Sequence, residues 1–264
     1  GNESAEGAVR LAGAVAGRRL VRLRGGEQLG GTVVEVPGPG RSFLPVPGWD
    51  CHDAPRGFER HHRDVSLATT LDRMERAVDD RLGPVREVGE QSSFPVPYYV
   101  AATAETTRFS DARCGEFGGG VAADWNAAYA KAVGEALERY AAGVYRESSF
   151  RHAPTTGVVD AVPVSAFVRP DDAPTPDPDE RVAWTDGANL RDGSYAAVPA
   201  SFVHFPQPGR AFTPQITTGL GLGNSTDEAL AAGLAEVIER DATMLAWYST
   251  FEPVELRVET DAFK

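Results

Sequence analysis

The sequence of 264 residues contains little cysteine and no long apolar run. Its two cysteines, Cys51 and Cys114, are too few for a disulfide framework, and the Cys51–His52 pair offers too few ligands for a zinc site. Because no run of about eighteen apolar residues occurs, the sequence predicts no transmembrane helix. The N-terminus lacks the basic and apolar segments of a signal peptide, so we expect a cytoplasmic protein.

Positive charge comes almost entirely from arginine. Lysine occurs only at Lys131 and Lys264, and the formal net charge is −12 with a pI of about 4.9. A polyanion would be repelled at long range, so we expect neither nucleic acid nor a membrane as a partner. The acidic excess is typical of a salt-adapted, halophilic host or of a GC-rich genome, and we favour the first. The hydrophobic content of 42% is sufficient for a sizeable core.

The pattern along the chain predicts an N-terminal β-hairpin and three helices. Leu20–Leu23 and Thr32–Val36 flank a glycine-rich segment, which is a hairpin signal, and residues 37–57 are rich in proline and glycine. A helix is expected over residues 66–81, where apolar residues recur on one face. Two longer helices are expected near residues 125–147 and 226–248.

The two longer helices carry an internal repeat. Gly134-Glu135-Ala136-Leu137-Glu138-Arg139 matches Ala235-Glu236-Val237-Ile238-Glu239-Arg240 without a gap. A glycine-rich segment precedes each helix, Gly118-Gly119-Gly120 in the first half and Gly219-Leu220-Gly221 in the second. Two copies are too few for a solenoid. The repeat instead predicts a pseudo-twofold domain with a site between its halves.

Helix geometry places the charged residues of each copy on one side of its helix. Glu135 and Glu138 lie about 60° apart on the helix wheel, and Glu228, Glu236 and Glu239 fall within about 80°. If the two faces meet, the carboxylates repel one another unless a hard cation such as Mg²⁺ lies between them. Arg139 and Arg240 can then hold phosphate oxygens. The alternative is an exposed charged face on which Arg139 pairs with Glu135 at a spacing of four residues.

These motifs resemble the YcaO family. The run Thr217-Thr218-Gly219-Leu220-Gly221-Leu222-Gly223-Asn224-Ser225-Thr226-Asp227-Glu228-Ala229 is similar to the glycine-rich entry into the second acidic helix of that family. Glu236-Val237-Ile238-Glu239-Arg240-Asp241-Ala242, followed by Trp247, resembles that helix, and Gly134–Tyr140 resembles the first one. The resemblance covers residues 66–264. It leaves residues 1–65 as an N-terminal β-hairpin and irregular extension.

The resemblance implies an α+β fold with mixed β-sheets and helices around an ATP site. By resemblance, Glu135, Glu138, Glu236 and Glu239 are Mg²⁺ ligands. Glu228 and Arg240 complete the nucleotide site, with Arg240 on phosphate.

The family phosphorylates a backbone amide oxygen of a peptide or protein, together with or after attack of a nucleophile on the carbonyl carbon. The implied product is an azoline, a thioamide or an amidine, as in cyclodehydration, thioamidation and other post-translational modification of ribosomally synthesised peptides. The nucleophile stays open between a Cys, Ser or Thr side chain and external sulfide. A partner protein that delivers substrate or sulfur, and a homodimer, also stay open. No catalytic side chain is assigned, because such phosphoryl transfer depends on positioning and charge neutralisation.

Three features depart from the family pattern. Gly118-Gly119-Gly120 has no lysine where many members have Gly-Lys-Gly, and Thr217-Thr218-Gly219 replaces Ser-Asn-Gly. Members also continue beyond the position of Lys264, so we expect the domain to be incomplete at its C-terminus and turnover to be lost. The alternatives are therefore an inactive nucleotide-binding regulatory module and a structural domain. A carboxylate-bridged di-iron site is excluded, because neither helix has a Glu-x-x-His pair.

Overall fold

The computed structural model contains four α-helices and three antiparallel sheets among the residues that it describes. Those residues are 2–27, 29, 31–36, 38, 40–42, 60, 62, 64–250, 252, 254, 255 and 257. In chain order, the elements are α1 (Asn2–Arg24), β1 (Thr32–Val34), β2 (Gly40–Ser42), α2 (Leu67–Ala77), β3 (Val85–Ser92), β4 (Tyr98–Thr103), β5 (Phe117–Val121), α3 (Trp125–Ala142), η1 (Glu147–Ser149), β6 (Arg151–Ala153), η2 (Thr155–Gly157), η3 (Val164–Ala166), β7 (Val182–Ala188), β8 (Tyr195–Pro199), η4 (Ala200–Phe202) and α4 (Thr226–Tyr248). Of the helices described, none has the length and apolar character that crossing a membrane would require. The expected α+β fold is confirmed.

The N-terminal segment differs from the prediction. Leu20–Leu23, expected as a strand, lies inside α1, because this stretch is rich in the strong helix formers alanine, leucine and arginine. The helix ends at the glycine pair that follows, where Gly26 has a φ of +86°, a conformation that glycine adopts without strain. A hairpin does occur, but β1 pairs with β2. The division at residue 65 stays a prediction.

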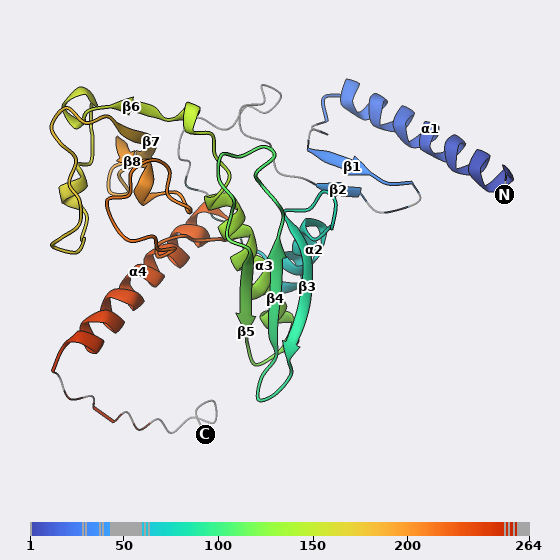
Figure 1. Ribbon diagram of the computed structural model, residues 1–264. Helices are drawn as coiled ribbons and strands as arrows, with labels where there is room; N and C mark the ends of the chain where they lie inside the picture. Colours follow the sequence, from blue (N-terminus) through green and yellow to red (C-terminus); the bar gives the residue numbers. More distant parts are fainter. Residues whose placement is uncertain are drawn as a thin grey trace.

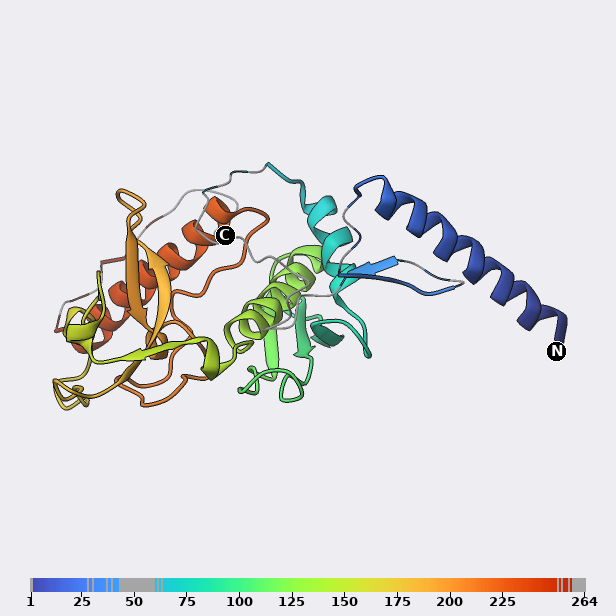
Figure 2. The same cartoon turned by 90° about the horizontal axis from the view of Figure 1, so that it is seen from above.

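The first three-stranded sheet, in the order β3-β4-β5, packs against α3 (Figures 1 and 2). Its core joins Val85 and Ala101 of the sheet to Ala132, Val133 and Ala136 of α3. The small residues let the helix approach the sheet closely. A Cβ on Gly118 or Gly120 of β5 would lie within 2.4 Å of the α3 backbone, so only glycine fits at these two positions. The glycine-rich segment therefore holds α3 against the edge strand.

The second three-stranded sheet, in the order β6-β7-β8, has its own core. Trp184 and Phe212 are its largest members, and the indole N–H of Trp184 donates to the Ala153 carbonyl oxygen at 2.9 Å. The chain passes from this sheet through η4 and a long connection into α4. The long helices α3 and α4 therefore emerge from different sheets, and the site depends on where they approach each other.

Each site helix begins at a side-chain cap. Ser66, Asp124 and Ser225 accept hydrogen bonds from backbone N–H groups in the first turns of α2, α3 and α4. The observed helices lie within the expected ranges 66–81, 125–147 and 226–248. Along α4, only Gly233 is buried among the residues described, and Ile238 is 69% exposed.

Candidate functional site

Glu135 of the first acidic motif ties α3 to the glycine-rich strand β5. One of its carboxylate oxygens accepts a hydrogen bond from the backbone N–H of Gly119, and the other accepts from Arg139 at 2.6 Å. Arg139 also donates to the carbonyl oxygen of Phe117 at 2.6 Å. Both residues therefore have structural partners, and Arg139 is held along the edge of β5.

The second motif makes related contacts. The Glu236 carboxylate accepts a hydrogen bond from the backbone N–H of Gly219 at 3.1 Å. A Cβ on Gly221 would lie 2.2 Å from the carbonyl oxygen of Ala229, just as one on Gly120 would lie 2.1 Å from that of Ala128. In both halves, a glycine of the leader segment thus touches the helix backbone and the first glutamate of the motif binds a leader N–H. A pseudo-twofold relation between the halves stays a prediction.

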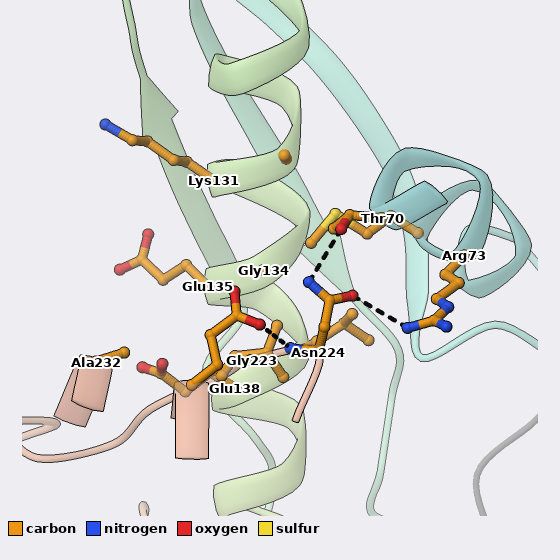
Figure 3. A pocket seen from close by; sticks show the side chains of 14 residues that line it. Thr70, Arg73, Lys131, Gly134, Glu135, Glu138, Gly223, Asn224 and Ala232 are labelled. Carbon is orange, nitrogen blue, oxygen red and sulfur yellow. Dashed lines mark hydrogen bonds between the residues drawn. The ribbon is translucent and has the colours of Figure 1, made fainter. Parts of the chain in front are cut away.

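A cavity of about 510 Å³ lies between α2, α3 and the start of α4. Figure 3 shows the carboxyl groups of Glu135 and Glu138 on α3 on the side of the ribbon where α4 begins. The described residues that line the cavity are Thr70, Arg73, Met74, Ala130, Lys131, Gly134, Glu135, Leu137, Glu138, Leu222, Gly223, Asn224, Glu228 and Ala232.

Asn224 fixes the wall of this cavity that faces α2. Its side-chain amide donates to the Thr70 hydroxyl oxygen at 3.0 Å, and its amide oxygen accepts from Arg73 at 3.2 Å (Figure 3). Its backbone N–H donates to Glu228 at 2.8 Å, while the Glu228 N–H donates to Ser225. These last two bonds form a helix cap, so Glu228 stabilises the start of α4 as well as lining the cavity.

Glu138 is the side chain whose electrostatics most clearly indicate a cation site. Burial raises the pKa of its carboxyl group, and the nearby carboxylates of Glu236 and Glu135 raise it further. Arg139 and a backbone hydrogen bond from Leu222 lower that pKa only in part. Three carboxylates from two helices are therefore close enough for their charges to interact, and a cation among them would relieve the repulsion.

The remaining predicted site residues lie on the exposed surface of α4. Glu239 and Arg240 follow Glu236 along the helix, and both side chains are exposed and outside the cavity lining. Among the residues described, Arg240 makes no ion pair, whereas Arg139 pairs with Glu135. The two arginines of the repeat consequently differ. Arg139 is hydrogen-bonded to Phe117 and Glu135, whereas Arg240 is available to bind an anion.

The oxygen donors around Glu138 are of the kind that magnesium binds. Carboxylate oxygens are the ligands that Mg²⁺ prefers, and one to two carboxylates usually suffice when a phosphate supplies the others. The raised pKa of Glu138 shows that negative charge at this point is not neutralised by the protein. Within the described part of the chain, no group of three or more acidic, histidine or cysteine side chains is placed so that it could hold a metal ion. The residues therefore fit a magnesium ion that also binds a ligand's phosphates.

Several cavity residues were not predicted from the sequence. Thr70, Arg73 and Lys131 carry no local motif, and Asn224 was noticed only as part of the glycine-rich run. Lys131 is of particular interest because Gly118-Gly119-Gly120 has no lysine. Its ammonium group donates to the carbonyl oxygen of Val121 at 3.1 Å, directly after the glycines, so a cation is present beside the segment.

Comparisons with known proteins show the family and the fold of this chain. Residues 119–263 match the model of a family described as YcaO cyclodehydratases that bind ATP and Mg²⁺. The match includes both acidic motifs and more than half of the chain. No curated protein matches the chain significantly.

Two solved structures have a similar fold. The YcaO structure from Methanopyrus kandleri bound with AMPPCP and Mg²⁺ has a TM-score of 0.58 and 26% identity, with 75% of this chain and 49% of that chain covered. A heterocyclase in complex with substrate and cofactor has a TM-score of 0.61 and 19% identity, with 73% and 31% covered. The chain thus spans about half the length of the first structure and about a third of the second.

Proposed function

This chain belongs to the YcaO family, and we propose that it binds ATP with Mg²⁺ in the cavity between α2, α3 and α4 to activate a backbone amide of a peptide or protein. The observation that carries the proposal is that Glu135 and Glu138 of α3 and Glu228 of α4 line this one cavity, while Glu236 is near enough to raise the pKa of Glu138. A structural domain has no use for three mutually repelling carboxylates beside an open cavity, because their repulsion lowers its stability.

The residues divide into groups by what they can hold. Glu138 and Glu236 would be the central Mg²⁺ ligands, with Glu135 beside them. Glu239 is exposed and outside the cavity lining, and its role as a ligand stays a prediction. Asn224, Thr70 and Arg73 offer hydrogen bonds to the nucleotide from the α2 side. Arg240 and Lys131 supply positive charge for the phosphates, while Glu228 holds the start of α4 in place.

These residues would contribute to the reaction by positioning the phosphates and neutralising their charge. When bound, Mg²⁺ offsets the negative charge of the transferred phosphoryl group. A nucleophile adds to the amide carbonyl carbon, and the carbonyl oxygen takes the γ-phosphoryl group of ATP with release of ADP. The C–O bond then breaks with loss of a proton and releases inorganic phosphate. The chain's carboxylates fix where the phosphates lie, and Arg240 and Lys131 stabilise the charge that spreads over their oxygens. The product is an azoline or a thioamide on a peptide, according to whether a side chain or external sulfide attacks.

Calorimetric titration of the 264-residue chain with AMPPCP, in the presence and absence of Mg²⁺, tests the binding half of the proposal. We expect saturable binding that is at least about tenfold tighter with Mg²⁺, because the carboxylates repel a metal-free nucleotide. Absence of binding under both conditions would indicate the structural-domain alternative. Binding without turnover of any peptide would agree both with the loss of turnover expected from the sequence and with the regulatory module.

A peptide labelled with ¹⁸O at its backbone carbonyl tests the chemical half. If the amide oxygen is phosphorylated, the label appears in the inorganic phosphate that is released with ATP and Mg²⁺. Unlabelled phosphate, released at the same rate with and without peptide, would mean that the site hydrolyses ATP and does not activate amides.

The two arginines of the repeat are expected to respond differently to substitution. Arg240→Ala should leave the melting temperature unchanged and weaken AMPPCP–Mg²⁺ binding about tenfold, because an exposed cation loses only its contact with phosphate. Arg139→Ala should lower the stability by roughly 1–3 kcal/mol, because it removes hydrogen bonds to Phe117 and Glu135. Thermal unfolding and calorimetry of both variants measure the contrast. Equal effects on binding, with no change in stability, would show that both arginines contact the phosphates.

A further inference from the structure

We propose that a second cavity, on the other side of the Gly219 segment from the acidic cluster, binds an uncharged backbone segment of the peptide substrate together with one apolar or aromatic side chain. The proposal rests on the proposed function, since it names the substrate subsite that would accompany the nucleotide site. The cavity measures about 510 Å³, which is large enough for a dipeptide unit.

The walls of this second cavity suit an apolar side chain. The rings of Phe167 and Phe202 stack with their centroids 4.0 Å apart. The rest of the apolar lining comes from Val168, Val203, Phe205, Ile216, Leu220 and Val237. Ile216 remains 58% exposed, so the cavity is open to a ligand from solvent. An apolar side chain that entered it would remove both its own surface and these walls from water.

Two polar atoms in the same lining lack partners. Ser201 is 4% exposed, and its hydroxyl oxygen makes no hydrogen bond to any part of the chain that the structure describes. The side-chain amide oxygen of Gln207 is buried and equally without a partner among those residues. Such groups cost free energy unless something binds them. A peptide unit has one N–H donor and one C=O acceptor, and these match the Gln207 oxygen and the Ser201 hydroxyl.

The charge of the lining decides against a nucleotide. None of the described residues that line this cavity is aspartate, glutamate, lysine or arginine. Burial lowers the pKa of His204, so its ring is uncharged at neutral pH. A phosphate or carboxylate placed here would lose its hydration without gaining a cation, which is strongly unfavourable. A neutral amide meets no such penalty.

The cavity is preformed and adjoins the nucleotide site. The backbone N–H of Phe205 donates to the carbonyl oxygen of Ala142 at 3.1 Å, and the Tyr145 hydroxyl donates to that of Pro206 at 3.0 Å. These two hydrogen bonds hold the segment around Phe205, which forms one wall of the cavity. Gly219 and Leu220 line this cavity, Leu222 and Gly223 line the first, and the Gly219 N–H donates to Glu236, so the same short segment borders both sites. A peptide held here would have its next amide close to the phosphates.

The sequence contains reporters for both sites, because it has two isoleucines and two methionines. Ile216 lines the second cavity and Met74 lines the first, whereas Ile238 and Met244 lie exposed on α4 and line neither. We would label the methyl groups of both residue types with ¹³C and titrate the chain with N-acetyl-phenylalanine methylamide. The Ile216 signal should shift at millimolar probe, while the Ile238 and Met244 signals should stay in place. N-acetyl-phenylalanine, which carries a carboxylate, should bind at least about tenfold more weakly.

Two variants remove the polar atoms without removing a hydrogen bond within the protein. Ser201→Ala and Gln207→Leu should each weaken probe binding about three- to tenfold, since each loses one hydrogen bond to the ligand. Neither should lower the melting temperature, because neither atom has a partner in the described chain. Ser110→Ala is the matched control. Ser110 is 3% exposed and donates to Gly143 and Tyr145, so this substitution should lower the melting temperature by several degrees and leave probe binding unchanged.

Two results would overturn the proposal: an Ile216 signal that does not respond to the neutral probe, or a response that Ser201→Ala and Gln207→Leu leave unaltered. Titration with AMPPCP–Mg²⁺ tests the nucleotide site separately, because the nucleotide should shift the Met74 signal whether or not the peptide binds. A shift at Met74 without one at Ile216 would reject the peptide subsite and keep the nucleotide site. A shift at Ile216 without one at Met74 would reject the nucleotide site.

Discussion

Replacing Glu138 by glutamine should weaken Mg²⁺-dependent AMPPCP binding by about a hundredfold or more and, at neutral pH, raise the melting temperature of the metal-free protein. The first effect follows because a neutral amide is a poor ligand for a hard cation, and losing one well-placed charge typically costs this much. The second follows because the substitution removes one of three carboxylates that repel one another. Opposite changes in binding and stability are characteristic of a functional residue.

The stability gain of Glu138→Gln should depend on pH in a defined direction. The folded-state pKa of Glu138 lies above its ordinary value of about 4.5, so the folded protein binds its proton more tightly than the unfolded chain does. Wild type is therefore destabilised at neutral pH, and this penalty disappears as the pH falls through the folded-state pKa toward 4.5. The difference in melting temperature between variant and wild type should be largest near pH 7 and should shrink on acidification.

Glu90→Gln is a suitable control for both measurements, since Glu90 is an exposed carboxylate of β3 outside the cavity lining. It should change neither binding nor the pH profile. A Glu138→Gln variant that binds normally and melts earlier would mean that Glu138 is structural.

Replacing Gly120 by alanine should destabilise the protein by about 3 kcal/mol or more. Its new Cβ would lie 2.1 Å from the carbonyl oxygen of Ala128 and 2.3 Å from the N atom of Ala132, both backbone atoms that cannot move independently of α3. Overpacking of this kind typically costs 1–3 kcal/mol and more when backbone must shift. Displacement of α3 would also move Glu135 and Glu138, so nucleotide binding should fall with stability.

Gly119→Ala is the matched control from the same strand. A Cβ there would have its nearest neighbour, a ring carbon of Tyr98, at 3.5 Å, which is ordinary van der Waals contact. Urea unfolding of the two variants should therefore differ by at least about 2 kcal/mol. Equal stabilities would show that the glycines are not required for the approach of α3 to β5.

The acidic helices could be predicted from the sequence because helix periodicity and spacing are local properties. Glu135 and Glu138 share one side of a helix whatever surrounds it, and Ser225 before Thr226 marks the start of α4. The expected strand at Leu20–Leu23 was wrong because a short apolar run fits a helix as well as a strand, and the alanine-rich context favoured the helix.

The α2 wall of the cavity could not be predicted, because it depends on contacts between residues far apart in the chain. Asn224, a member of the glycine-rich run, meets Thr70 and Arg73 across more than a hundred and fifty residues, and neither Thr70 nor Arg73 belongs to a motif. The internal repeat also predicts that Arg139 and Arg240 have equivalent roles. The two arginines have different surroundings. A carbonyl oxygen of β5 accepts a hydrogen bond from Arg139, whereas the exposed face of α4 provides no such acceptor for Arg240 among the residues described.

The central claim, that the two acidic helices hold a single magnesium–nucleotide complex, is tested most directly by a double-mutant cycle between Glu138 and Glu236. AMPPCP–Mg²⁺ affinity would be measured calorimetrically for wild type, Glu138→Gln, Glu236→Gln and the double variant. If both carboxylates serve one ion, each single substitution should remove most of the Mg²⁺-dependent affinity, and the double variant should bind little more weakly than either single variant. If Glu236→Gln binds as wild type does, or if the two losses simply multiply, the helices do not share an ion and the account is wrong.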